Sequence, residues 1–315
     1  MTRPLLLHVG YHKTATTWLQ SVLFTPGQGF HEVLDHAAVF DRLIAPHGLD
    51  FAPADPAERI AAAQKAAPAG ARVDVISLES LSGLPFAGGR ESDAYARRLR
   101  AVADLIDAPR ITVLIGVREQ CALLASVYMQ YLYRAGTQPP RRFFEERPFR
   151  GYFGFSAQTF CYDRLVGLYQ ELFGARNVLV LPQELIARDQ QAAVRLIGTA
   201  CGHDDLARAA WQPRTARMPS YPQYAVPLLR RVNHLRREAC NPAPMIDLGR
   251  LGTLGYRGAG WLARKAPLPR AVASARPVTA HVRARFGGRF ADSNRRLAEM
   301  LHHEVALPGY QGLGS

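Results

Sequence analysis

The sequence predicts an α/β fold in which a parallel sheet is flanked by helices, and two observations lead to this expectation. Short runs of β-branched and leucine side chains recur along the chain, and these runs are almost wholly apolar. Stretches of helical character separate one run from the next. Strands that are apolar throughout are typical of a parallel sheet covered on both faces, and such sheets bind ligands beyond the carboxyl ends of their strands.

The elements can be placed in chain order from these patterns. Strands are predicted at residues 5–10, 73–78, 111–117 and 177–181. Helices are predicted at 16–24, 56–67, 120–134 and 190–201, and a last one at 291–302 has Leu297 and Leu301 at helical spacing. The alternation of the two kinds of element favours a doubly wound sheet.

We expect the 315 residues to form a single domain, 1–315, with a basic helical subregion at 214–290. This subregion is rich in Pro, Gly and Arg, and it contains 15 lysines and arginines against two acids, Glu238 and Asp247. It therefore carries the whole net charge of +13. Two interpretations stay open: solvated faces of surface helices, or a patch that faces an anionic partner.

Composition and spacing exclude several classes of protein. No apolar stretch approaches the roughly 20 residues that span a bilayer. His8, His12 and Lys13 interrupt the N-terminal apolar run too early for a secretory signal. The four cysteines lack the spacing of a zinc site. We expect a cytoplasmic protein with no metal and no nucleic-acid partner.

The stretch HVGYHKTATTWLQ, residues 8–20, follows the first predicted strand. Its Lys13 is one of only three lysines, against 36 arginines, so composition does not account for it. A strand that ends in glycine and opens a helix presents backbone N–H groups, which bind anions together with the helix dipole. Lysine follows Gly10 after only two residues, which fits a Walker A loop poorly. The alternative is an ordinary helix start after a strand.

The residues after the lysine favour an anion site. Thr14 and Ala15 are small enough to let a ligand approach the backbone, and Thr16 and Thr17 add hydroxyl donors in the first helical turn. The order K-T-A-T-T-W-L resembles the 5′-phosphosulfate-binding loop of sulfotransferases that use 3′-phosphoadenosine 5′-phosphosulfate (PAPS), whose pattern is close to K-[ST]-G-T-T-W-L. The resemblance implies a P-loop-NTPase-like sulfotransferase fold, with Lys13 as a catalytic residue and residues 13–17 holding PAPS.

A second stretch, VREQCALLASVYMQY, supports the resemblance. In the same family an arginine ends this strand and a serine follows eight residues later in the next helix, and both bind the 3′-phosphate of the nucleotide. The corresponding residues here are Arg118 and Ser126. An arginine offers a fork of donors that matches phosphate oxygens. Taken alone, the pair would be interpreted as a strand-end ion pair and a polar helix residue.

The resemblance covers about residues 4–202 and returns weakly at 293–301 and at Gly309–Tyr310. Two positions depart from the pattern. Ala15 stands where glycine is usual, and Pro182–Glu184 replaces the Tyr-Glu step of many relatives. We therefore assign no cofactor contact to the strand that ends there.

The second predicted strand ends in SLESLS, which offers Ser77, Glu79 and Ser80. Because carbohydrate-acting relatives often use a glutamate near this strand end, we expect Glu79 to be the catalytic base, with a helix-capping role as its alternative. His12 is the other candidate base. The resemblance also implies that Trp18 stacks on adenine, and core packing is the equal alternative for it.

The predicted function is therefore sulfuryl transfer from PAPS to an acceptor hydroxyl, most favourably on a carbohydrate or glycolipid. The alternatives are a non-catalytic nucleotide- or glycan-binding module and, less favoured, a nucleotide kinase. A basic amphipathic helix is expected at 226–237, where Arg230, Arg231, Arg236 and Arg237 flank apolar residues. Such a helix can contact an anionic membrane surface or form a wall of the acceptor site, and it can equally be a surface helix of the core.

Overall fold

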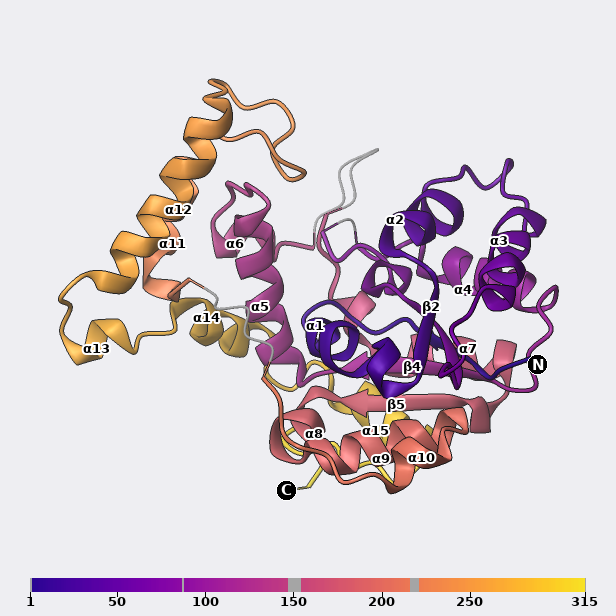
Figure 1. Cartoon of the computed structure of the whole chain (residues 1–315). Helices are drawn as coiled ribbons and strands as arrows, with labels where there is room; N and C mark the ends of the chain where they lie inside the picture. Colours follow the sequence, from indigo (N-terminus) through magenta and orange to yellow (C-terminus); the bar gives the residue numbers. More distant parts are fainter. Residues whose placement is uncertain (1, 87, 147–153, 216–220, 315) are drawn as a thin grey trace. The chain divides into compact units, whose positions relative to one another are not determined.

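The structure is a computed structural model that describes residues 2–86, 88–146, 154–215 and 221–314 (Figure 1). The chain divides into two compact units. The first comprises Met1–Glu119, Ala157–Ala216 and Phe290–Ser315, and the second comprises Gln120–Ser156 and Arg217–Arg289. The predicted basic subregion falls largely within the second unit, which also takes in the segment from Gln120. That the whole chain is a single domain stays a prediction.

The first unit is built on a five-stranded parallel sheet with the strand order β2-β3-β1-β4-β5. The strands are β1 Leu5–His8, β2 Phe30–Leu34, β3 Val73–Ser77, β4 Ile111–Val117 and β5 Val178–Pro182. Four of them confirm the predicted strands and the predicted α/β class. The edge strand β2 was not predicted, because its exposed Glu32 and half-exposed His31 interrupt the apolar run that marks a fully buried strand.

Helices cover both faces of this sheet (Figure 1). On one face, an apolar cluster joins β1, β3, β4 and β5 to the chain that follows β1 and to the helices after β5. The elements of this layer are α1 Thr16–Trp18, the π-helical turn η1 Leu19–Leu23, α8 Gln183–Arg188, α9 Gln190–Cys201 and α10 Asp204–Arg208. On the other face α7 Tyr162–Phe173 packs on β4 and β5 and is itself covered by α4 Ser92–Ala103 and α15 Ala291–Met300.

The remaining elements of the first unit are short or lie near the sheet edge. Helix α3 packs against β2, and η4 begins two residues after β3. Their bounds are η2 Pro26–Gln28, α2 His36–Val39, η3 Phe40–Ile44, α3 Ala54–Lys65, η4 Glu79–Ser82, η5 Ala157–Phe160 and η6 Ala175–Asn177. The predicted helices at 16–24, 56–67, 190–201 and 291–302 are confirmed to within two residues at each end.

The described part of the second unit consists of helices and connecting loops, with an isolated bridge between Glu238 and Asn241. Helix α14 packs on α5 and α6, and α11 packs on both α5 and α12. Its elements are α5 Gln120–Tyr133, α6 Pro140–Phe143, η7 Gln223–Ala225, α11 Val226–Asn233, α12 Gly249–Lys265, α13 Arg270–Ala273 and α14 Pro277–Phe286. This confirms the helical character expected for the basic subregion. Within the described ranges, no helix combines the length and the apolar character that crossing a membrane requires.

The basic helix predicted at 226–237 was wrong in its extent. Helix α11 ends at Asn233, and the side chain of Arg236 is only 4% exposed. Arg236 donates to the side-chain oxygen of Asn233 and to the carbonyl oxygen of Tyr133, and its guanidinium lies 4.2 Å from the ring centroid of Tyr256. It is a structural residue of this unit, so it does not belong to an exposed basic face.

Candidate active site at the carboxyl ends of β1 and β4

The candidate site lies where the sheet changes its direction of winding. Strands β1 and β4 are neighbours, but the chain leaves β1 toward β2 and leaves β4 toward β5 on the other side. The crevice at such a point is the usual ligand site of an open parallel sheet. Here Gly10 and Gly116 pack so closely that a Cβ atom on Gly10 would lie 2.7 Å from the Gly116 nitrogen. Both glycines are therefore needed to bring the loop after β1 against the end of β4.

The loop after β1 contains two non-glycine residues in the left-handed conformation. The φ angles are 67° at Lys13 and 66° at Ala15, and this conformation costs an L-residue about 1–2 kcal/mol. Between them, the buried Thr14 donates its hydroxyl hydrogen to the Tyr11 carbonyl oxygen and closes the turn. Backbone strain of this kind recurs at ligand sites. The left-handed angle also explains why a glycine is usual at the position of Ala15 in the loops that this one resembles.

Helix α1 begins directly after Ala15, and its first residue has a hydroxyl group that lacks a partner. The Oγ1 atom of Thr16 is buried, and within the described parts of the chain it makes no hydrogen bond. A buried polar group left in this way costs about 1–3 kcal/mol, which a bound anion would recover. The side chains of Lys13 and Thr17, by contrast, are exposed. The loop thus offers the N–H groups of a helix start, two hydroxyls and one ammonium group to a ligand.

Arg118 follows β4 and lies beside this loop. Its Nη1 atom donates to the Lys13 carbonyl oxygen over 3.4 Å. The carbonyl oxygen of Arg118 accepts from the Tyr162 hydroxyl at 2.6 Å. The next residue, Glu119, donates its N–H to Glu184 Oε1 at 2.9 Å. The structure therefore brings Lys13 and Arg118, two of the sequence-predicted residues, to one edge of the sheet. Hydrogen bonds from Tyr162 and to Glu184 fix the backbone at Arg118 and at the next residue.

A layer of buried tyrosines supports both strand ends. The ring of Tyr162 lies 4.7 Å from that of Tyr11 and 6.5 Å from that of Tyr310, and the Tyr310 hydroxyl donates to Glu184. Burial raises the pKa of all three phenols well above the usual range, so they stay neutral donors. Glu184, where the sequence departs from the family pattern, is thus bonded to the chain after β4 and to the C-terminal segment.

The two candidate bases lie next to each other. Glu79 opens η4, two residues after β3, and its Oε1 atom lies 3.8 Å from Nδ1 of His12. Both side chains are partly exposed at the same edge of the sheet as Lys13. At this distance the two groups form an ion pair when His12 is protonated, and they are too far apart for a hydrogen bond. The structure brings the two alternatives together and leaves the choice between them open.

A buried histidine under the loop was missed by sequence reasoning. His8, the last residue of β1, is fully buried, and its Nδ1 atom lies 2.7 Å from the Ser77 hydroxyl oxygen. Gln20 Nε2 donates to the same oxygen at 3.0 Å, so the Ser77 hydroxyl is free to donate its hydrogen to His8. Burial lowers the pKa of His8 to about 4, and Glu79 acts weakly in the other direction. The sequence signal for His8 is an imidazole that directly follows three leucines at the end of a buried strand.

Two further sequence-predicted cofactor residues, Trp18 and Ser126, are engaged in other contacts. Trp18 is 5% exposed, packs against Trp211 with ring centroids 5.9 Å apart, and donates its ring N–H to the Arg214 carbonyl oxygen. This is the core packing that was the alternative to adenine stacking, and stacking stays a prediction. Ser126 belongs to α5 of the second unit, where its hydroxyl donates to the Ala122 carbonyl oxygen at 3.0 Å. Its contact with a 3′-phosphate likewise stays a prediction.

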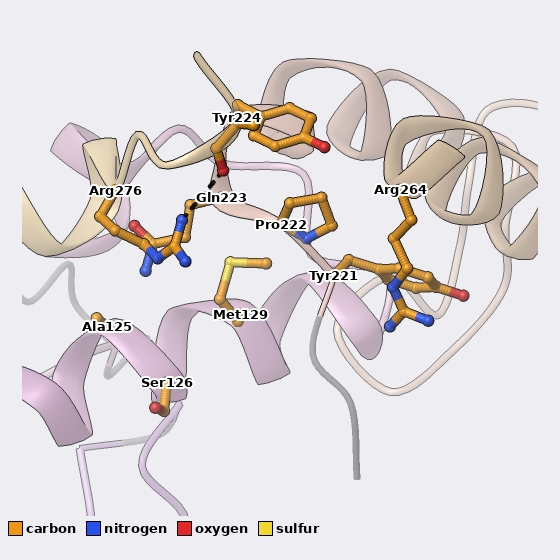
Figure 2. Close-up of a pocket in the computed structure, with 10 residues that line it drawn as sticks. Ala125, Ser126, Met129, Tyr221, Pro222, Gln223, Tyr224, Arg264 and Arg276 are labelled. Carbon is orange, nitrogen blue, oxygen red and sulfur yellow. Dashed lines mark hydrogen bonds between the residues drawn. The ribbon is translucent and has the colours of Figure 1, made fainter. Parts of the chain in front are cut away.

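The second unit has a cavity of its own, with a volume of about 400 Å³ (Figure 2). Ser126 and Met129 of α5 form one wall, and the chain around Gln223 forms another. Two cationic side chains, Arg264 and Arg276, also line it. The cavity therefore combines apolar, hydroxyl and guanidinium groups. Over the described ranges, neither unit contains a cluster of three or more His, Cys, Asp or Glu side chains that could hold a metal ion.

Comparisons with solved structures found two sulfotransferases among the similar folds. A sulfotransferase from Alicyclobacillus acidocaldarius is 18% identical over 79% of this chain and 98% of its own, with a TM-score of 0.48. The sulfotransferase domain of the olefin synthase from Synechococcus PCC 7002 is 12% identical over 91% of this chain and 96% of its own, with a TM-score of 0.37. At such low identities and TM-scores, the likeness does not extend to donor or acceptor. Neither a protein-family model nor a curated protein sequence matches the chain.

Proposed function

We propose that the chain is a sulfotransferase that moves a sulfuryl group from PAPS to a hydroxyl group of an acceptor. The observation that carries the proposal is the loop at Lys13. Its sequence, K-T-A-T-T-W-L, resembles the phosphosulfate loop, and its left-handed Lys13 and Ala15 lie at the crevice between β1 and β4. The buried hydroxyl of Thr16 is a donor that an anionic ligand would satisfy.

The residues around the loop fit the two anionic ends of such a nucleotide. The backbone N–H groups at the start of α1, with the Thr16 hydroxyl, would hold the 5′-phosphate. The Arg118 guanidinium would bind the 3′-phosphate through paired donors. PAPS supplies an activated sulfuryl group, and its bridging oxygen gains negative charge as that group departs. The Lys13 ammonium would stabilise this charge, as a preorganised donor does in phosphoryl transfer.

The proton of the acceptor hydroxyl needs a base at the same edge of the sheet. Glu79 is our choice, because it lies just after β3 and carries a carboxylate that is partly exposed to an incoming acceptor. His12 lies 3.8 Å away and would orient that carboxylate or take its place. A glutamate at this strand end is typical of carbohydrate-acting relatives, which favours a carbohydrate or glycolipid acceptor. We expect the reaction to take place in the cytoplasm.

The first test is nucleotide binding measured by calorimetry with the full chain. We expect 3′,5′-adenosine diphosphate to bind and ATP to bind much more weakly. Arg118→Ala should weaken 3′,5′-adenosine diphosphate by about 10–100-fold, because hydrogen bonds to charged groups contribute about 1.5–3 kcal/mol, and should leave 5′-AMP nearly unchanged. Arg110→Ala is the matched control, since Arg110 lies at the amino end of the same strand. Preference for ATP would favour a kinase and overturn the proposal.

A second experiment separates an enzyme from a non-catalytic binding module. PAPS is incubated with the protein and a mixture of glycolipids, and 3′,5′-adenosine diphosphate is measured as the product. An enzyme forms the product at a rate that depends on Glu79 or His12. A module would bind the nucleotide, keep the specificity set by Arg118 and form no product in the presence of any acceptor class.

A further inference from the structure

Helix α12 of the second unit presents an apolar face to solvent. We call Leu251, Leu254, Trp261 and Leu262 the α12 outer face, and each of these side chains is 59–69% exposed. With 3.6 residues per turn they fall on one side of the helix. The chain before and after the helix adds further exposed apolar side chains, namely Met245, Ile246, Leu248, Leu268 and Val272. Scattered exposed apolar residues are common, but a contiguous stripe of this length indicates an interaction surface.

The opposite face of α12 fixes which side points outward. Gly252, Tyr256 and Gly260 are buried and repeat every four residues. A Cβ atom at Gly252 would lie 2.4 Å from the Leu235 carbonyl oxygen, and one at Gly260 would lie 2.2 Å from the ring of Tyr221. These glycines let the helix pack closely on the rest of its unit. The helix cannot rotate its apolar stripe inward without breaking these contacts.

Positive charge runs along one flank of the same face. Arg250 and Arg257 are exposed and seven residues apart, so they line up two turns apart. Arg264 continues the spacing, but its guanidinium lies 4.6 Å from the ring centroid of Tyr221, on the side of the helix that packs on the rest of the unit. Lys265 is also exposed, and by helical spacing it falls on the side of the apolar stripe at the end of the helix. Between Leu248 and Ala291 the sequence contains nine lysines and arginines and no acidic residue. The α12 outer face is therefore amphipathic and is bordered by positive charge along one flank.

The arginines singled out from the sequence do not supply such a face. Arg236 is buried against Tyr256, Arg230 donates to the Thr137 carbonyl oxygen, and Arg237 forms an ion pair with Asp247. Of the four, Arg231 at the end of α11 and Arg237 are exposed, and Arg237 is engaged in that ion pair. The surface for an anionic partner lies on α12 instead.

We propose that the α12 outer face binds the surface of an anionic lipid bilayer. A 17-residue helix is about 25 Å long and lies flat, with its apolar stripe among the acyl chains and its arginines at the phosphate groups. Trp261, in the last two turns of the helix, has the ring type that is enriched at membrane interfaces. A second copy of the chain is a poor occupant, because the cationic borders would repel each other, whereas anionic headgroups complement them.

The experiment is vesicle flotation with the full-length protein. Vesicles of phosphatidylcholine with about a third phosphatidylglycerol are compared with vesicles of phosphatidylcholine alone, and salt is varied. We expect binding to the anionic vesicles only, weakening as salt rises. Fluorescence of Trp261 should shift to shorter wavelength and be quenched by brominated acyl chains. Trp18 is buried in the other unit, and Trp261→Phe isolates the signal.

Two sets of substitutions separate the apolar and cationic contributions. Leu254→Gln with Trp261→Gln and Leu262→Gln should reduce vesicle binding at least 10-fold. Arg250→Gln with Arg257→Gln and Lys265→Gln should reduce it on the order of 100-fold. All six side chains are exposed, so thermal unfolding should stay close to that of the native chain. The matched control removes three exposed arginines of the first unit, Arg59, Arg97 and Arg195, and should leave vesicle binding nearly unchanged.

Several results would overturn the proposal. Binding to anionic vesicles that survives the apolar substitutions would show general charge attraction in place of helix insertion. An equal loss with the control set would mean that net charge, not α12, controls binding. A lipid-free dimer in analytical ultracentrifugation that Trp261→Gln abolishes would assign the face to a second copy. A protein that binds no vesicle would also rule the lipid surface out. So would a protein whose α12 outer face binds an acidic protein and not lipid.

Discussion

The loop at Lys13 and the basic segment from Val226 to Lys265 both place cationic side chains beside apolar ones, but their structures arise differently. In the loop, the left-handed Lys13 and Ala15 shape the backbone within a few residues of sequence, while the contact of Gly10 with Gly116 is long-range. In the basic segment, packing against distant residues decides which arginines are exposed. Arg236 is buried by Tyr256, twenty residues away, while Arg257, next to that tyrosine, is exposed. A local motif therefore indicates function more directly than a charge pattern does.

The largest effect is expected for Lys13→Ala, which tests the role of the loop. Turnover should fall on the order of 10²–10³-fold, because the leaving phosphate loses its preorganised cationic donor. Affinity for 3′,5′-adenosine diphosphate should change much less, since the backbone N–H groups remain. Lys65→Ala, at the exposed end of α3, is the matched control and should behave as the native chain. Turnover of Lys13→Ala within a few-fold of native would remove Lys13 from the catalytic role.

The basic segment is tested by comparing Arg236 with Arg231. Arg236→Gln should lower the free energy of unfolding by about 3 kcal/mol, because it removes charged hydrogen bonds to Asn233 and Tyr133 and a cation–π contact with Tyr256. Arg231→Gln changes the same charge on the surface and should stay within about 0.5 kcal/mol of native. Chemical denaturation gives both values. Equal effects at the two positions would mean that burial does not distinguish these arginines.

Four strands of the sheet could be predicted, because each is a short run of mostly apolar, buried side chains and helical stretches separate these runs along the chain. The half-exposed β2 could not, since its pattern is not that of a buried strand. Within the site, the loop motif indicated Lys13 and Thr16 and the second motif indicated Arg118, but bringing the two motifs together depends on the close approach of Gly10 to Gly116. That contact is a property of the folded sheet and has no local signature.

His8 shows the same limit and gives a prediction of its own. Its pKa is lowered to about 4 in the folded chain, below the ordinary value of 6.5, so between these values the unfolded chain binds more protons. The free energy of unfolding should therefore fall as pH falls through this window, by on the order of 2 kcal/mol between pH 7 and pH 5.

The measurement is a series of denaturation curves at different pH for the native chain and for His8→Asn. The asparagine side chain can still accept from Ser77 but does not titrate, so the difference between the two pH profiles isolates His8. His47→Asn, at an exposed position, is the control. If the free energy of unfolding changed with pH by the same amount in the native and His8→Asn proteins, His8 would not be a buried neutral histidine. The half-buried His281 and His303, whose pKa values partial burial also lowers, cancel in that difference.

The smallest expected effect compares strain in the two regions directly. Ala15, in the loop at Lys13, and Ala135, after α5, have nearly the same left-handed φ, 66° and 65°. Ala→Gly at each should raise the free energy of unfolding by less than about 1 kcal/mol, because the relief of left-handed strain exceeds the extra entropy that glycine gives the unfolded chain.

The two variants should differ in their effect on function, although their effects on stability are similar. The phosphosulfate loops that this loop resembles have glycine at the position of Ala15, so Ala15→Gly should keep nucleotide affinity within a few-fold of native. If turnover changes in either variant, it should change in Ala15→Gly. Ala135→Gly should alter neither quantity, because its strain only ends a helix. Denaturation, calorimetry and turnover on both variants check this. A loss of stability at Ala15 with a gain at Ala135 would show that other contacts hold the loop at that residue, and that its φ is not a source of strain.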